Sequence, residues 1–143
     1  MKPINEMRMT IQSRSVNEGF ARVAVASFLS QLDPTIDEIN DIKTAVSEAV
    51  TNCIVHAYKD KIGKIYISVN IYEDKTVAIR IRDNGCGIEN VEQAREPLYT
   101  TAGGERAGLG FAVMESFMDK VRVTSKKDKY TSVVLKKRIG TKQ

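Results

Sequence analysis

The sequence predicts an α/β (α+β) fold of two layers, in which helices cover one face of a mixed, mostly antiparallel sheet. Three observations support this class. Apolar and polar residues alternate in several short segments, apolar residues recur at helical spacing in three longer ones, and tight turns join the alternating segments in pairs. With 143 residues, the chain can bury one core of ordinary size but not two. We therefore expect a single domain over residues 1–143.

The first alternating segment covers residues 7–11 and predicts a strand with one buried face. Ser15 and Glu18 follow with the spacing of a capping box, which predicts a helix that runs to about Leu32. Its apolar positions recur at helical spacing and include Phe20, Val23, Ala24 and Phe28.

A second and longer helix is predicted after the break at Asp33-Pro34. Thr35 and Glu38 again have the spacing of a capping box, and the apolar positions beyond them keep the helical period to about Ala57. This helix carries the first group of candidate functional residues.

The middle of the chain predicts a hairpin followed by a long loop. Apolar and polar residues alternate over 65–71 and again over 77–81, with a turn at 73–75 between them. From Asp83 to Gly110 the periodicity is lost and glycine is frequent. A loop of this length in so small a domain is typical of a functional segment.

The last part of the chain predicts one helix and two strands. Helical spacing returns over 109–118, and strands are expected over 121–124 and 131–135. We expect the tail after Arg138 to fray.

Composition and charge narrow the function classes. The chain is 42% hydrophobic and 28% charged, and no apolar run approaches the roughly 20 residues that cross a bilayer. Its amino terminus lacks a signal-peptide pattern, so we expect a cytoplasmic protein with no membrane contact. Cys53 and Cys86 are expected to be free thiols. The net charge of +4 could attract nucleic acid, but there is no basic recognition helix or aromatic stacking set, so we expect no direct nucleic-acid contact.

The first candidate motif lies in the second helix. Glu48, Asn52 and His56 have i, i+4, i+8 spacing, which places them along one stripe. A carboxylate can take a proton from a hydroxyl, and a side-chain amide oxygen suits Mg²⁺. Alone, the stripe also fits a polar, solvent-facing side of a helix.

The second motif is Asp83-Asn84-Gly85-Cys86-Gly87, directly after a predicted strand. A carboxylate at a strand end can accept a hydrogen bond from an amino group such as that of adenine, and glycine lets a backbone approach a ligand closely. The same residues would also form an ordinary turn.

The third motif is the glycine-rich run over 103–111, in which a helix begins. Backbone N–H groups at a helix start can bind phosphate, and Arg106 could pair with a terminal phosphate. The run matches neither the P-loop nor the dinucleotide fingerprint, and a flexible hinge is the alternative.

Taken together and in order, the three motifs resemble the GHKL (Bergerat) ATP-binding fold of gyrase-type ATPases, Hsp90, histidine kinases and MutL. Glu48 to Asn52 look like its N box, Asp83 to Gly87 its first glycine box, and Gly108 to Gly110 its second. Among these families the anti-sigma-factor serine kinases are the closest in size, and the likeness covers almost the whole chain. It includes the segments 47–52, 97–101 and 114–119.

The resemblance implies a serine protein kinase that uses ATP with Mg²⁺ and releases ADP. It implies Glu48 as the general base toward a serine hydroxyl, Asn52 as the Mg²⁺ ligand and a nucleotide contact, and Asp83 as the adenine contact. The other nucleotide contacts that it implies are Gly85, Gly87, Thr100, Thr101, Arg106, Gly108, Leu109, Gly110 and Thr131. Tyr130 is a departure, because the family often has glycine before this threonine.

The resemblance also implies the partners. The protein would be a homodimer that holds a sigma factor of the sporulation (sigma F) type inactive, and it would phosphorylate a serine of the cognate anti-anti-sigma factor. Arg22 on the first helix matches an arginine that contacts partners in this family.

Other functions remain open from the sequence. The chain could be a general-stress-type anti-sigma kinase, or a nucleotide-gated binding switch without kinase activity. A plain ATPase of the gyrase or Hsp90 sort would need further domains, and a histidine-kinase fragment would need a phosphoacceptor helix. Glu48 favours the kinase over the switch, because only the kinase needs a base there.

Overall fold

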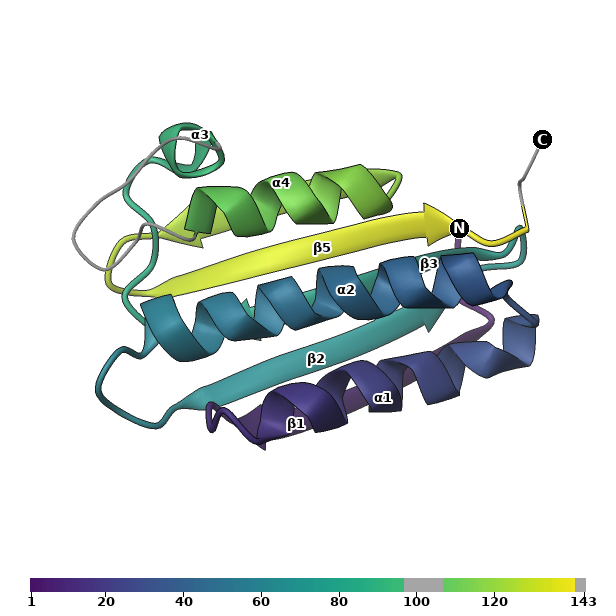
Figure 1. Ribbon diagram of the computed structural model, residues 1–143, viewed down its shortest axis with the longest axis horizontal. Helices are drawn as coiled ribbons and strands as arrows, with labels where there is room; N and C mark the ends of the chain where they lie inside the picture. Colours follow the sequence, from purple (N-terminus) through teal and green to yellow (C-terminus); the bar gives the residue numbers. More distant parts are fainter. Residues whose placement is uncertain (97–106, 141–143) are drawn as a thin grey trace.

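The computed structural model describes residues 1–96 and 107–140, and these residues form a five-stranded sheet with helices packed on it (Figure 1). The strand order is β1-β2-β3-β5-β4. The strands are β1 (Asn5–Gln12), β2 (Lys64–Ile71), β3 (Thr76–Asp83), β4 (Lys120–Lys126) and β5 (Tyr130–Arg138). The helices are α1 (Asn17–Leu29), η1 (Ser30–Leu32), α2 (Ile36–Asn52), η2 (Cys53–Ala57), α3 (Val91–Ala94) and α4 (Ala107–Phe117).

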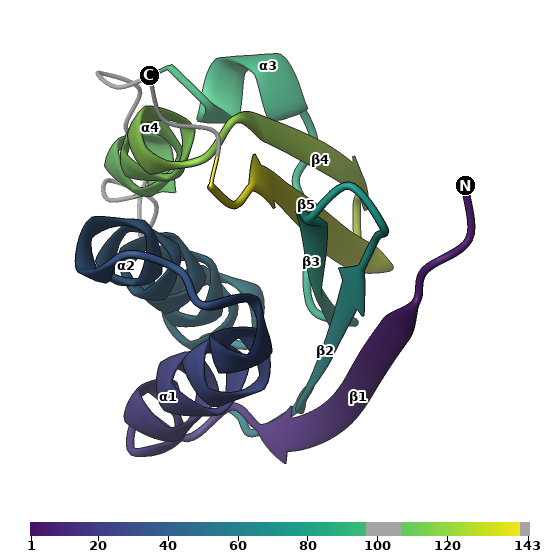
Figure 2. The same ribbon diagram turned by 90° about the vertical axis from the view of Figure 1, so that its right-hand side faces the viewer.

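The two predicted layers are confirmed. Seen along the sheet, α1, α2 and α4 lie together on one side of it (Figure 2). The strands bury their alternate side chains toward these helices, so that Ile65, Ile67 and Ile81 are at most 1% exposed. Where the prediction allowed a mixed sheet, all four pairings among the described strands are antiparallel.

The apolar face predicted for α1 is wrong at Phe20 and Val23, although Phe28 is partly buried against the core. Phe20 and Val23 are 57% and 53% exposed, whereas Ala21, Val25 and Leu29 are fully buried. Both sets have helical spacing, so periodicity alone does not choose between them. Ala21, Val25 and Leu29 are spaced by four residues and form the buried stripe of α1, whereas Phe20 and Val23 lie on its exposed side.

The amino ends of the two long helices differ from each other. Thr35 and Glu38 form the predicted capping box of α2, each side chain bonding the other residue's backbone N–H. The capping box predicted from Ser15 and Glu18 is absent, because α1 begins at Asn17 with Val16 as its cap residue. Glu18 instead bonds side chains of α1 and α2, as described below.

The carboxyl end of α2 changes helical form. After Asn52 the chain continues through one turn of π-helix, η2, whose last residue is Ala57. A π-turn shifts the direction of the residues beyond it and is frequently found at functional sites. The predicted helix end near Ala57 is therefore confirmed, although its last turn is not α-helical.

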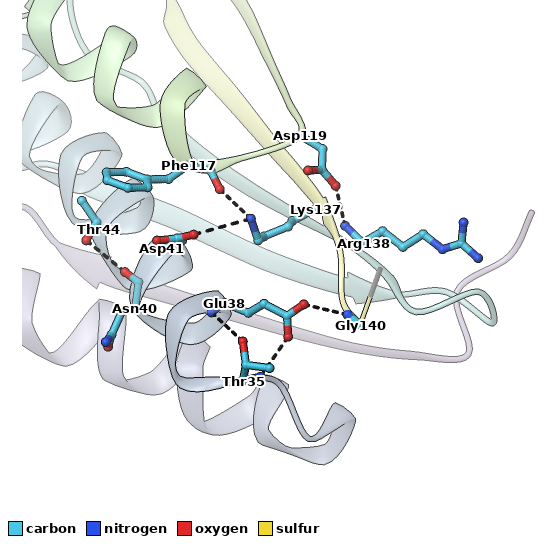
Figure 3. Close-up of polar contacts among 10 residues, drawn as sticks. All are labelled: Thr35, Glu38, Asn40, Asp41, Thr44, Phe117, Asp119, Lys137, Arg138 and Gly140. Atoms are coloured by element: carbon cyan, nitrogen blue, oxygen red, sulfur yellow. Dashed lines mark hydrogen bonds and ion pairs between the residues drawn. The ribbon is translucent and has the colours of Figure 1, made fainter. Parts of the chain in front are cut away.

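The end of β5 is bound to the helices (Figure 3), and Ile139 and Gly140, the two described residues of the tail that was predicted to fray, are also held in place. Lys137 Nζ donates to the carbonyl of Phe117 at 2.8 Å and lies 3.8 Å from Asp41 Oδ2, which ties β5 to both α4 and α2. Ile139 is 3% exposed, and the Gly140 N–H donates to Glu38 at 2.7 Å.

Within the described residues, no helix combines the length and hydrophobicity required to cross a membrane.

Candidate functional site

Three polar residues lie side by side at one end of the sheet, on the face toward the helices. Asp83 of β3 pairs with Thr131 of β5, which in turn pairs with Ser125 of β4. Residues opposite each other in antiparallel strands project to the same face. Asp83 and Thr131 are 3% and 8% exposed, so this row is an almost buried polar cluster at the edge of an apolar core.

Asp83 is a buried carboxylate with few partners. Its Oδ1 accepts a hydrogen bond from the Gly85 N–H at 2.9 Å. Burial raises the pKa of Asp83 above its usual range, and the Gly85 N–H and the Cys53 thiol limit the rise. Burial also raises the pKa of the Cys53 thiol well above its usual value, with Asp83 adding to the rise. A buried acceptor of this kind suits a hydrogen-bond donor on a ligand.

The loop after Asp83 is held on both sides by backbone. The Cys86 N–H donates to the Ala57 carbonyl at 3.0 Å, and the Asp128 N–H donates to the Cys86 carbonyl at 2.6 Å. A Cβ on Gly85 would lie 2.4 Å from the Ala57 oxygen, and one on Gly87 would lie 2.2 Å from the oxygen of Lys126. Gly87 also has a φ of +71°, so both glycines are required by the packing of this loop.

Glu48 and Asn52 of α2 meet Gly110 of α4. A Cβ on Gly110 would lie 3.2 Å from Glu48 Oε1 and 3.4 Å from both Asn52 side-chain atoms, Oδ1 and Nδ2. The structure thus brings the carboxylate and the amide of α2 next to a glycine backbone that follows them by more than 50 positions in the sequence. Because Gly110 has no side chain, no Cβ crowds the polar ends of Glu48 and Asn52 on this side.

Asn52 provides a test of whether a ligand fits here. Its Nδ2 is buried and, among the residues that the structure describes, is the one such side-chain nitrogen or oxygen without a hydrogen-bond partner. Leaving a buried donor unpaired costs about 1–3 kcal/mol, so the position is suited to an acceptor such as a phosphate oxygen. The amide oxygen on the same side chain is a hard donor of the type that Mg²⁺ binds. The residues present therefore fit a Mg²⁺-nucleotide.

The metal would depend on the nucleotide for most of its ligands. In the described part of the chain, no group of three or more histidine, cysteine, aspartate or glutamate side chains could hold a metal ion. Mg²⁺ is commonly bound through one or two protein oxygens together with water and substrate phosphates. A single amide oxygen at Asn52 agrees with that mode.

The remaining predicted site residues fall in three places. Gly108 and Leu109 lie in the first turn of α4, and the Leu109 side chain is 52% exposed. His56, which shares the stripe of Asn52 in sequence, lies in the π-turn η2 and accepts a bond from Cys86 Sγ through its backbone oxygen. Thr100, Thr101 and Arg106 lie outside the described residues.

Arg22 on α1 is connected to α2 through Glu18. Arg22 Nη1 lies 2.9 Å from Glu18 Oε2, and Ser47 Oγ donates to the same oxygen at 2.5 Å. Ser47 directly precedes Glu48. The Arg22 side chain is 41% exposed, so its position is set by Glu18 while its outer edge remains open to solvent.

Sequence reasoning missed three residues of this region. Glu18 was assigned to a helix cap, and Tyr58 and Ser125 were not considered. The Tyr58 hydroxyl donates to the Lys64 carbonyl at 2.6 Å and accepts from the Asn84 N–H at 2.8 Å, which fixes the start of the glycine loop. Ser125 could have been found from its parity, because it continues the inward-facing row of Val121 and Val123 with a polar side chain.

The fold and the site define an ATP-binding domain class, and sequence comparison agrees. Residues 11–137 match the family described as "Histidine kinase-like ATPase domain". In structure, the chain resembles the RsbU and RsbW domains of Rv1364c from Mycobacterium tuberculosis, with a TM-score of 0.69 at 20% identity over 96% of this chain and 33% of that one. A blue-light activated histidine kinase of Erythrobacter litoralis aligns with a TM-score of 0.53 at 18% identity, over 79% of this chain and 39% of that one. At these identities the two structures show the shared fold.

Closer relatives refine the class. The chain is 55% identical to an anti-sigma F factor of Clostridium perfringens, over 96% of this chain and 99% of the relative. It is 57% identical to one from Clostridium beijerinckii, over 95% and 96%, and 53% identical to one from Priestia megaterium, over 94% and 93%. The chain belongs to the anti-sigma F factor family, within the histidine kinase-like ATPases of the GHKL fold.

Proposed function

We propose that this protein is an anti-sigma factor and a serine protein kinase. It binds and inhibits a sporulation sigma factor of the sigma F type, and it phosphorylates a serine of the cognate anti-anti-sigma factor with Mg²⁺-ATP. The observation that carries the proposal is the meeting of Glu48, Asn52 and Gly110, which combines a carboxylate with a buried amide nitrogen that lacks a hydrogen-bond partner. The family membership supports the same function.

The residues would divide the work of phosphoryl transfer. Bound Mg²⁺-ATP supplies the phosphoryl group and the charge neutralisation that transfer requires. Asn52 holds the metal through its amide oxygen, and Glu48 orients the serine hydroxyl and accepts its proton. Asp83 and Thr131 bind the adenine end, while Gly85, Gly87, Gly108 and Gly110 let the backbone approach the nucleotide. Thr100, Thr101, Leu109 and Arg106 complete the nucleotide contacts, with Arg106 on the terminal phosphate.

The partner surface is proposed on α1. Arg22 is 41% exposed and held by Glu18, and the apolar side chains of Phe20 and Val23 on α1, and of Val16 just before it, are exposed. Arginine and aromatic side chains are enriched in the cores of protein interfaces. The protein acts in the cytoplasm as a homodimer of this single domain and returns ADP after transfer.

Transfer of labelled phosphate from ATP to an anti-anti-sigma protein tests this function. We expect Mg²⁺-dependent label on one serine of the partner, located by mass spectrometry and abolished by EDTA. Replacing that serine by alanine in the partner is the matched control. Tight ATP binding without any transfer to partners from the same pathway would contradict the kinase and favour the alternative, a nucleotide-gated switch.

A further inference from the structure

Ser125 lies beside the proposed adenine contacts and has no role in the account so far. It stands at the end of the buried row formed with Thr131 and Asp83. Its Oγ is within hydrogen-bond distance of three groups: the backbone N of Ile88 at 2.7 Å, the carbonyl of Tyr130 at 2.7 Å and the Thr131 hydroxyl at 2.8 Å. The Ser125 side chain on β4 therefore contacts both the loop that follows Asp83 and Thr131, the proposed adenine contact.

Counting protons assigns the direction of each bond. A serine hydroxyl has one proton to donate and two lone pairs to accept with. The Ile88 N–H can only donate, so it uses one lone pair of Ser125, and the Tyr130 carbonyl can only accept, so it takes the one proton. The second lone pair faces Thr131. The Thr131 hydroxyl must therefore donate its own proton to Ser125.

This assignment fixes what Thr131 offers to a ligand. With its proton directed at Ser125, the Thr131 hydroxyl can only accept hydrogen bonds from a ligand, through its two lone pairs. Asp83, directly opposite on β3, is also an acceptor when ionised. Both polar groups of this end of the site then accept hydrogen bonds. They match a 6-amino purine, which donates there, and repel the lone pairs of a 6-oxo purine.

We propose that Ser125 is a positioning residue that holds the Thr131 hydroxyl as an acceptor and so sets the preference of the site for 6-amino over 6-oxo purine nucleotides. It acts through Thr131 and the Ile88 backbone and does not contact the nucleotide. The inference rests on the nucleotide site proposed above. A role limited to supporting the strand would weaken all nucleotides alike, so the ratio of affinities separates the two roles.

The test is titration of the full chain with ATP and with inosine triphosphate, which carries a 6-oxo group and lacks the 2-amino group of guanine. The variants are Ser125→Ala, which lets the Thr131 hydroxyl turn toward the pocket, and Ser125→Thr, which keeps the hydroxyl. Ser132→Ala is the matched control, because the Ser132 hydroxyl accepts from Arg80 at 3.0 Å and takes no part in the row. Circular dichroism verifies that each variant folds.

We expect the native chain, Ser125→Thr and Ser132→Ala to prefer ATP to the same degree. In Ser125→Ala the ratio of the two dissociation constants should fall by roughly tenfold, the effect of one neutral hydrogen bond. An unchanged ratio with both nucleotides weakened equally would overturn the role of Ser125 and leave the nucleotide site standing. If the native chain bound neither nucleotide, the proposed function itself would be contradicted.

Discussion

Glu48 Oε1 lies 3.2 Å from the point that a Cβ on Gly110 would occupy. The contact joins α2 and α4 at the proposed site of phosphoryl transfer. A substitution at Gly110 therefore tests that site directly. In the middle of a helix, glycine is less favourable than alanine by about 0.5–1 kcal/mol, so its presence here is a cost to α4.

Gly110→Ala should separate stability from function. The new methyl group would also lie 3.4 Å from Asn52, so it would narrow the space for metal and phosphate. We expect affinity for Mg²⁺-ATP to fall at least about tenfold, while the melting temperature stays within a few degrees because helix propensity offsets the crowding. Gly19→Ala in α1 is the control, since a Cβ there meets nothing within 4 Å. Native affinity in Gly110→Ala would contradict the placement of the nucleotide.

Gly87→Ala should destabilise the fold more than Gly140→Ala. Both glycines have positive φ, +71° and +80°, but only Gly87 faces a backbone oxygen, that of Lys126. Urea denaturation should show a loss of about 1–2 kcal/mol for Gly140→Ala from the left-handed backbone alone. We expect a clearly larger loss for Gly87→Ala, together with loss of nucleotide binding. Equal losses would mean that the loop can move away from the β4–β5 turn without cost.

Glu18→Ala should weaken partner binding, because Glu18 holds Arg22 on the proposed partner surface of α1. Without this carboxylate, Arg22 loses its 2.9 Å partner and Ser47 loses its acceptor. Because the ion pair is partly exposed, stability should change by less than about 1 kcal/mol. Calorimetric titration with the sigma factor should show a three- to tenfold lower affinity. The control is Glu6→Ala, which removes an exposed acid 4.0 Å from Arg8. Native affinity in Glu18→Ala, with Arg22→Ala impaired, would show that Arg22 needs no support.

Nucleotide affinity should fall on the acid side because of Asp83. Burial raises the pKa of this carboxyl above its usual 3.8, and only the ionised form accepts from an amino group without a competing proton. Affinity is therefore full above the raised pKa and is lost as the pH falls through it. Titrations at successively lower pH should show this decline, with proton release on binding.

The contribution of Asp83 to the free energy of unfolding changes with pH in the opposite direction to its contribution to nucleotide affinity. The native state keeps the proton to higher pH than the unfolded chain, so this group's contribution decreases as the pH rises from 3.8 to the raised value. The control variant is Asp74→Asn. Exposed Asp74 lies in the turn before β3, at the opposite end of that strand from Asp83, and the Thr76 N–H lowers its pKa. If the decline of nucleotide affinity at acid pH persisted in Asp83→Asn, this pH dependence would belong to another group.

Much of the fold could be predicted from local patterns. The alternation over 65–71 and 77–81 specified a hairpin, and with it the parity that places Asp83 on the helix-facing side. The glycines and Thr131 were located by their likeness to a family. Two errors arose where a tertiary contact decides the outcome. Phe20 has the correct period but points outward, and Glu18 has the spacing of a cap but bonds Ser47, 29 positions away.

Ser125 shows the remaining limit. Its significance depends on three bonds, to Ile88, Tyr130 and Thr131, that form only after β4 pairs with β5. The alternation with Val121 and Val123 indicates only that Ser125 faces inward, and it does not reveal these bonds. Register, rather than composition, is the information that the sequence alone did not supply.

The most direct test of the central claim is the single-turnover rate of phosphate transfer in Glu48→Gln. The substitution keeps the shape and polarity of the side chain but removes its capacity to accept a proton at neutral pH. We predict a rate at least about a hundredfold lower, the usual contribution of a general base, with ATP and sigma-factor affinities within a few-fold of native. Transfer at the native rate would contradict the assignment of Glu48 as the base.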